Sequence, residues 1–274
     1  LELLTATNDS SFIVQGNFTV IPAAGRTVTI VGLENIDPDG PLQLNGNVVA
    51  ANPCYFNLLG SVLRDSVNIT GTGVISRISG NDIDGEVIVR YATVTGNFID
   101  EFLRILPDVS LASEDSLFVV GNRIGEGVIW ESGQHYFFMT NNYVRSADDT
   151  GLDFLRVKAG GGYNLIENNM LLGNMEDVIY FRNNMDGRRV KITNNVAIRN
   201  IGSIRIFLSA DSVGSAELSI NYNLYRLFTL GAAANCQNCV TLGNITSAVN
   251  YNPTTGAVLS SIAINSGHPG KLYT

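Results

Sequence analysis

Charged residues, prolines, cysteines and histidines are all scarce in this sequence. Charged side chains make up 15% of its 274 residues, and Asp and Glu outnumber Lys and Arg by 25 to 17, which gives a net charge of −8. A chain so poor in cations lacks the clustered Lys and Arg that neutralise phosphates, so we expect no nucleic-acid partner. No run of about 18 apolar residues is present, so we also expect no membrane span.

Hydrophobic residues and glycines are abundant by contrast. Hydrophobic types make up 45% of the chain, which allows a large core and excludes general disorder. The 28 glycines against 7 prolines indicate many tight turns rather than a proline-rich linker. A single all-β body of this length is common, so one β-rich architecture is the simplest expectation.

A short pattern repeats along most of the chain. Alternating apolar residues precede a turn that contains Asn, and a second apolar stretch follows, as in "VKITNNVA" and "NLIENNML". The steps between successive copies are 20 to 28 residues, which is the period of a solenoid built from short strands. The Leu spacing of a leucine-rich horseshoe is absent. The repeated position is occupied by Asn97, Asn122, Asn142, Asn169, Asn195, Asn223 and Asn244, with Thr72 in the same place upstream.

The segments "ITNN", "IENN" and "MTNN" resemble the bends of secreted parallel β-helix proteins with the pectate-lyase-like architecture. The resemblance covers residues 66–250 and implies an all-β, single-stranded right-handed parallel β-helix with coils of about 20–28 residues. Residues 1–65 would then be irregular N-terminal coils or a cap, and residues 251–274 a closing segment. That segment contains "AINSGHPG", which resembles the "AIDAGDP" end of bacterial cell-surface β-helix proteins.

In such a solenoid, equivalent residues of successive coils stack at a spacing of ~4.8 Å. Stacked Asn side chains can hydrogen-bond to one another and satisfy polar groups that a bend exposes. Asn and Gly also tolerate the left-handed backbone that such bends need, and Gly96, Gly121 and Gly243 precede three of the Asn positions. We therefore predict that the seven asparagines form one column.

Three N-terminal segments have their own patterns. Residues 12–32 resemble two strands around the turn "PAAG". Residues 53–65 fit either a short helix or another coil. Residues 99–107 carry apolar residues with helical spacing, which predicts a one-turn insertion within a coil, on Ile99, Phe102, Leu103 and Leu106.

Aligning neighbouring coils on their asparagines brings charged residues together. Asp148 and Asp149 then lie over Glu176 and Asp177, and Arg156 lies over Arg182. Polysaccharide lyases of the resembling architecture use acids to hold calcium and a Lys or Arg to take a proton. The simpler interpretation is that opposite charges on neighbouring coils neutralise each other. If the protein is an enzyme, its catalytic candidates are Asp148, Asp149, Asp177, Arg156, Lys158, Arg182 and Arg205, with Asp153 close to them.

Hydrolases similar to polygalacturonase offer a second enzymatic comparison. Asp148-Asp149 match their Asp pair, and Arg156-Val157-Lys158 loosely match their Arg-Ile-Lys. The distance between these two segments is far too short, and the Gly-His-Gly motif is absent. Neither His135 nor His268 lies in a suitable context. The sequence therefore favours a protein that is not an enzyme.

Residues 81–86, "NDIDGE", have the Asp-x-Asp-Gly form of a calcium loop, with Asp82, Asp84 and Glu86 as its candidate ligands. The Glu that an EF-hand requires is missing, which favours a plain turn. Calcium is the one cofactor for which the sequence offers candidate ligands.

The three cysteines fall in two places. Cys236 and Cys239 form a Cys-x-x-Cys that has neither the second pair of a zinc site nor the βαβ context of a redox motif. In an extracellular protein, a local disulfide that closes a turn is the plainer interpretation. Cys54 should lie about seven coils away, roughly 30 Å at ~4.8 Å per coil, and cannot reach that pair within one chain.

Two functions follow from these patterns and stay open. The first is a non-catalytic extracellular or cell-surface protein with a structural, adhesive or self-assembling role. Its partner would be itself, because "LELLTATN" and "TGAVLSSIAIN" are apolar and end-to-end stacking would bury the strand edges there. The second is a carbohydrate-active β-helix, a polysaccharide lyase or glycoside hydrolase, or a glycan-binding module, with a polysaccharide as partner.

Overall fold

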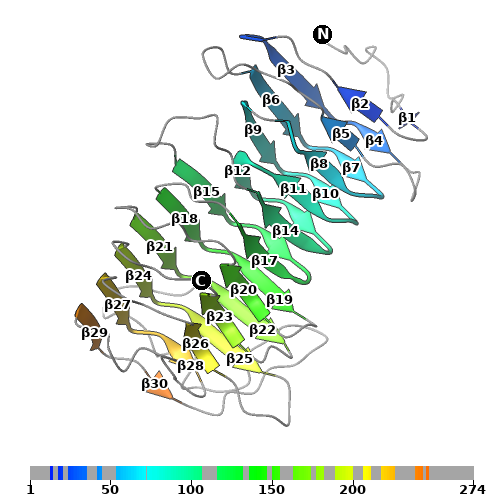
Figure 1. The fold of residues 1–274 in the computed structure, drawn as a ribbon. Helices are drawn as coiled ribbons and strands as arrows, with labels where there is room; N and C mark the ends of the chain where they lie inside the picture. The colour runs from blue at the N-terminus through cyan, green and yellow to red at the C-terminus, as the bar shows by residue number, and fades with distance from the viewer. Residues whose placement is uncertain are drawn as a thin grey trace.

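The computed structural model describes residues 13–14, 18–20, 24–35, 42–44, 54–71, 73–106, 116–131, 136–146, 150–154, 163–173, 177–181, 189–199, 206–210, 217–225, 238–242 and 245–246. These parts contain strands, turns and bends but no helix, and so no helix that could cross a membrane. The strands pair in parallel and form three sheets that run the length of the molecule (Figure 1). The chain is the all-β parallel β-helix that the repeat predicts.

Each sheet is a stack of short strands. Sheet A contains β3 (Thr27–Val31), β6 (Cys54–Leu59), β9 (Val74–Ser79), β12 (Tyr91–Thr95), β15 (Ser116–Val120), β18 (Tyr136–Thr140), β21 (Tyr163–Glu167), β24 (Arg189–Thr193), β27 (Glu217–Asn221) and β29 (Asn238–Leu242). Sheet B contains β1 (Ile13–Val14), β4 (Glu34–Asn35), β7 (Val62–Leu63), β10 (Asp82–Ile83), β13 (Phe98–Ile99), β16 (Arg123–Ile124), β19 (Tyr143–Ser146), β22 (Met170–Gly173), β25 (Val196–Arg199), β28 (Leu224–Tyr225) and β30 (Ile245–Thr246). Sheet C contains β2 (Phe18–Val20), β5 (Leu42–Leu44), β8 (Val67–Ile69), β11 (Val87–Val89), β14 (Phe102–Ile105), β17 (Gly127–Trp130), β20 (Thr150–Phe154), β23 (Asp177–Phe181) and β26 (Ile206–Ala210).

One coil contributes one strand to each sheet. The chain passes through sheets B, C and A in turn, as in β10, β11 and β12, and then starts the next coil at β13. The same order holds from β1 to β28, so the strands before residue 66 belong to the same three sheets as those after it. The ten described strands of sheet A give nine spacings, which span ~43 Å at ~4.8 Å each.

Alternate residues of each strand point into the coils and form the core. β6 and β15 show this alternation of buried and more exposed residues directly. Residues from two sheets meet inside, where the rings of Trp130 on β17 and Phe137 on β18 stack with centroids 4.7 Å apart. Burying one such large apolar side chain contributes roughly 1.5–3 kcal/mol. The strict alternation in the sequence is therefore the main determinant of the register.

Every described connection from sheet A to sheet B is a two-residue turn with a left-handed first residue. Its φ lies between 55° and 67° in each case. In the repeated Asn-Asn pairs the first Asn takes this conformation and the second carries the stacked side chain. Left-handed backbone and side-chain stacking therefore belong to two different residues. The left-handed residues are Gly32, Gly60, Gly80, Gly96, Gly121, Asn141, Asn168, Asn194 and Tyr222.

Two of the ambiguous N-terminal segments form strands. Residues 53–65 include β6 and β7, so the coil alternative is the one observed and the short helix is wrong. The predicted one-turn helix at 99–107 is also wrong. Ile99 ends β13, two turn residues follow, and Leu103 is buried in β14. Because two turn residues separate the strands, the inward-facing Ile99 and Leu103 are four residues apart, which is also the apolar spacing along one face of a helix.

Asn164 is an inward-facing polar residue with an unpaired oxygen. Asn164 is 1% exposed, lies between Phe137 and Val190 in the stack, and its Oδ1 has no hydrogen-bond partner. Its Nδ2 donates only a long bond of 3.3 Å to the carbonyl of Arg189. Burying an unpaired polar atom costs about 1–3 kcal/mol.

We therefore expect Asn164→Val to raise the free energy of unfolding by about 1 kcal/mol, because it removes an unpaired oxygen from an apolar column. Urea denaturation followed by circular dichroism measures the change. Asn57→Val is the matched control, because the Nδ2 of Asn57 donates to Oγ1 of Thr29 at 3.0 Å on the outer face. If Asn164→Val instead lowered the free energy of unfolding as much as the loss of a stacked turn asparagine, Oδ1 would have an important partner.

Candidate functional site

The predicted asparagine column exists and is a continuous hydrogen-bonded ladder. The Nδ2 of Asn97 donates to Oδ1 of Asn122 at 2.9 Å and to the backbone carbonyl of Ile78 at 2.9 Å. The same Oδ1 accepts the backbone N–H of Asn97 at 3.0 Å. This set of bonds repeats coil after coil, and all members are at most 2% exposed: Asn97, Asn122, Asn142, Asn169, Asn195 and Asn223.

The ladder has a member before Asn97 that the sequence pattern does not identify. Asn81 donates from Nδ2 to Oδ1 of Asn97 at 2.9 Å, and its own Oδ1 accepts the backbone N–H of Ser61 at 2.8 Å. Asn81 therefore occupies the place before Asn97 that was assigned to Thr72, which lies outside the described residues, as does Asn244. The step from Asn81 to Asn97 is 16 residues, shorter than any step in the predicted repeat.

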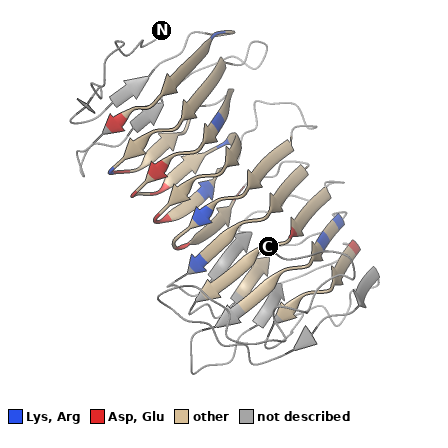
Figure 2. Cartoon of the chain, turned by 180° about the vertical axis from the view of Figure 1, so that it is seen from behind, with Lys and Arg blue, Asp and Glu red and all other residues tan. Residues whose placement is uncertain are grey.

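The acidic and basic catalytic candidates lie mainly outside the described residues. This applies to Asp148, Asp149, Arg156, Lys158, Glu176, Arg182 and Arg205. Asp177 and Asp153 lie on strands of sheet C, where Thr150 pairs with Asp177 and Asp153 pairs with Tyr180. Asp177 thus has Thr150 as its register partner in the preceding coil, and the predicted stacking of Asp149, which lies outside the described residues, stays a prediction. Figure 2 shows charged positions scattered along the described coils, without a continuous band of one sign.

The three calcium candidates lie at the turn between β10 and β11. The carboxylate of Asp84 accepts two bonds from the guanidinium of Arg64, at 3.0 and 3.1 Å. Glu86 forms an ion pair with Arg104, in which Oε1 lies 2.9 Å from Nε. Burial raises the pKa of Glu86, and Arg104 opposes that shift. Over the described parts of the chain, no three His, Cys, Asp or Glu residues come together as a metal site. Asp84 and Glu86 thus each pair with an arginine, and Asp82 lies on β10.

Cys54 is a buried free thiol at the start of β6, paired in register with Val74. Burial raises the pKa of this thiol, which makes it a poor nucleophile. Cys239 lies on β29 opposite Leu218, and Cys236 lies outside the described residues, so the predicted disulfide stays a prediction. A buried thiol also removes Cys54 as a surface group for linking two copies.

The outward-facing residues of sheet A, here called the sheet A face, form a regular grid along the molecule. They are largely hydroxyl, amide, aliphatic and aromatic side chains held in register across β3 to β27. Phe118 and Phe138 stack with parallel rings, 5.0 Å between centroids, and Tyr163 follows at 6.2 Å with a tilt of 52°. The central column of the grid is Thr29, Asn57, Arg77, Thr93, Phe118, Phe138, Leu165, Lys191 and Ser219.

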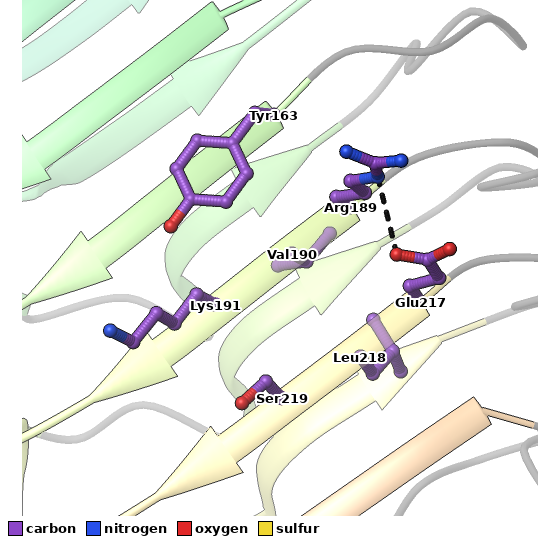
Figure 3. A pocket seen from close by; sticks show the side chains of 7 residues that line it. All are labelled: Tyr163, Arg189, Val190, Lys191, Glu217, Leu218 and Ser219. Atoms are coloured by element: carbon purple, nitrogen blue, oxygen red, sulfur yellow. Dashed lines mark ion pairs between the residues drawn. The ribbon is translucent and has the colours of Figure 1, made fainter.

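A shallow groove of about 420 Å³ lies on this face at the end of the aromatic stack. Figure 3 shows Tyr163 above Arg189 and Lys191, with Glu217 and Ser219 on the next strand. Arg189 and Glu217 form an ion pair of 3.2 Å, with side chains 68% and 58% exposed. The pKa of Tyr163 is raised by burial and then by Glu167, so its hydroxyl stays protonated at neutral pH. Sequence reasoning missed this groove, because its residues come from three strands.

No family model matches this chain, and no curated protein or solved structure matches it either. The fold, the ladder and the sheet A face are therefore the basis for a functional proposal.

Proposed function

We propose that this chain is a non-catalytic β-helix scaffold of the secreted, cell-surface type, with an adhesive role directed at polysaccharides. The observation that carries the proposal is the sheet A face, where nine strands in continuous register present one outward surface. The resemblance of "ITNN", "IENN" and "MTNN" to pectate-lyase-like bends supports the secreted type.

The sheet A face suits adhesion for two reasons. Its coils are held by the ladder and by parallel pairing, so the surface is rigid and loses little entropy when it binds. Its hydroxyl, amide and aromatic groups are the types that contact sugars through hydrogen bonds and ring faces. A linear polysaccharide and an extended sheet face can make many such contacts in parallel.

The test is retention of the full chain on immobilised neutral and acidic polysaccharides, with the polymer length measured after incubation. We expect retention without shortening of the polymer. Phe118→Ser removes an exposed aromatic from the sheet A face and should weaken retention, whereas Ile129→Ser on sheet C should not. Shortened polymer would contradict the non-catalytic role, and no retention on any polymer would contradict the adhesive role.

A further inference from the structure

We propose that the groove across β21, β24 and β27 binds a carboxylate-bearing sugar of an acidic polysaccharide, with Lys191 holding the carboxylate. This inference rests on the proposed adhesive function and adds the site and the chemical class of the ligand.

The charge of the groove is opposite to that of the protein. Its lining has two cations, Arg189 and Lys191, and one anion, Glu217, in a chain whose net charge is −8. Glu217 pairs with Arg189, and Lys191 has no ion-pair partner within the described parts of the chain. At physiological ionic strength the Debye length is about 8 Å, so distant charges hardly affect this ammonium group, and Glu167 on the paired strand β21 is a nearby acid outside the groove lining. Lys191 is therefore an available local cation.

The neighbouring ion pair can also take part in binding. Arg189 and Glu217 are both mostly exposed, and an exposed pair of this kind contributes only about 0–1 kcal/mol. Each side chain can therefore turn toward a ligand at little cost, Arg189 as a donor to oxygen atoms and Glu217 as an acceptor from sugar hydroxyls. Ser219 adds a hydroxyl on the same strand as Glu217.

The aromatic wall favours a ring-shaped ligand. Phe118 and Phe138 stack in parallel, so each covers one face of the other. Tyr163 is tilted by 52° from Phe138, and Figure 3 shows the broad side of its ring. A sugar ring can pack its C–H groups on that side while its carboxylate reaches Lys191 on the adjacent strand.

The shape of the groove favours a chain over a small enclosed molecule. From β21 to β27 it crosses two strand spacings, ~10 Å at ~4.8 Å each, which is long enough for two linked sugar rings. It is not enclosed, so a polymer can extend beyond it on the sheet A face. Nucleic acid is a poorer fit, because it needs several clustered cations rather than one available ammonium group.

Affinity electrophoresis of the full chain in gels that contain alginate tests the proposal, with carboxyl-reduced alginate as the matched polymer without acid groups. We expect retardation in alginate only. Lys191→Met should weaken the affinity about tenfold, the usual size of a lost charged hydrogen bond, and Lys191→Arg should restore most of it.

Arg145→Met is the matched control variant. Arg145 is exposed on β19 of sheet B, outside the sheet A face, and its loss changes the net charge equally. It should leave the affinity within about twofold, because its side chain lies on another sheet. Equal weakening by both variants would overturn the site, since the attraction would then be diffuse. If reduced alginate bound equally well, the proposal of an acidic ligand would be wrong. If only neutral polymers retained the protein, the acidic ligand would also be wrong, but the adhesive function would stand.

Discussion

Replacing Asn142 by Leu is expected to lower the free energy of unfolding by about 4 kcal/mol. The substitution keeps the size of the side chain but removes its polar atoms, which lie in the middle of the ladder. The backbone N–H and Nδ2 of Asn122 lose their acceptor, and the carbonyl of Val119 loses a donor at 2.8 Å. Oδ1 of Asn169 also loses one of its two donors. Each buried group left unpaired costs about 1–3 kcal/mol.

The measurement is urea denaturation of the full chain, followed by circular dichroism. Since each coil contacts mainly its neighbours, damage at one coil should also broaden the transition, because the coils on either side then unfold less cooperatively. Asn57→Leu is the control, as Asn57 lies on the sheet A face and donates one bond to Thr29. A loss below about 1 kcal/mol for Asn142→Leu would show that the ladder does not hold the coils together.

The fold could be predicted from the sequence because two independent signals agree. Strand residues alternate in burial, and the turn between sheets A and B has a constant length of two residues with fixed requirements. The first residue adopts a left-handed backbone, and from Asn81 to Asn223 the second fills a buried slot with a side chain that both donates and accepts. Gly or Asn followed by Asn meets both needs, so this turn is visible in the sequence.

The site was harder to predict because it depends on register between coils of different lengths. The step from Asn142 to Asn169 is 27 residues, and the same step takes Thr150 to Asp177. The register therefore gives Asp177 a hydroxyl residue, Thr150, as its partner in the preceding coil. Asn81 was missed because only Arg90 separates β11 from β12, which makes its coil unusually short.

The groove could not be predicted for the same reason, its dependence on the register between coils. Tyr163, Arg189 and Glu217 are 26 and 28 residues apart in sequence and belong to no common motif. They become neighbours only because β21, β24 and β27 pair in strict register. A chemical cluster on a solenoid face can be recognised only after every coil has been aligned, whereas a ladder position can be recognised one turn at a time.

Gly85→Ala is expected to lower the free energy of unfolding by about 3 kcal/mol, because the turn between β10 and β11 leaves no room for a Cβ atom. An added Cβ would lie 2.6 Å from the backbone N and 2.7 Å from Oγ of Ser66, and 2.8 Å from the carbonyl carbon of Asp65. Ser66 cannot move away freely, since its Oγ accepts the backbone N–H of Glu86 at 3.1 Å and the next residue pairs with β11. The glycine of "NDIDGE" is thus explained by the closeness of the preceding coil.

The controls are two substitutions at Gly80, a turn position with φ of 67° and open space around its Cβ direction. Gly80→Ala should cost about 1–2 kcal/mol through left-handed strain alone. Gly80→Asn should cost less, because Asn141, Asn168 and Asn194 adopt the same conformation at equivalent positions. The urea midpoint should therefore be highest for Gly80→Asn, lower for Gly80→Ala and lowest for Gly85→Ala. Adding calcium or a chelator should leave the wild-type midpoint unchanged. A Gly85→Ala variant as stable as Gly80→Asn would mean that the coils can separate locally, and a calcium-dependent midpoint would restore the carboxylates of this turn as calcium ligands.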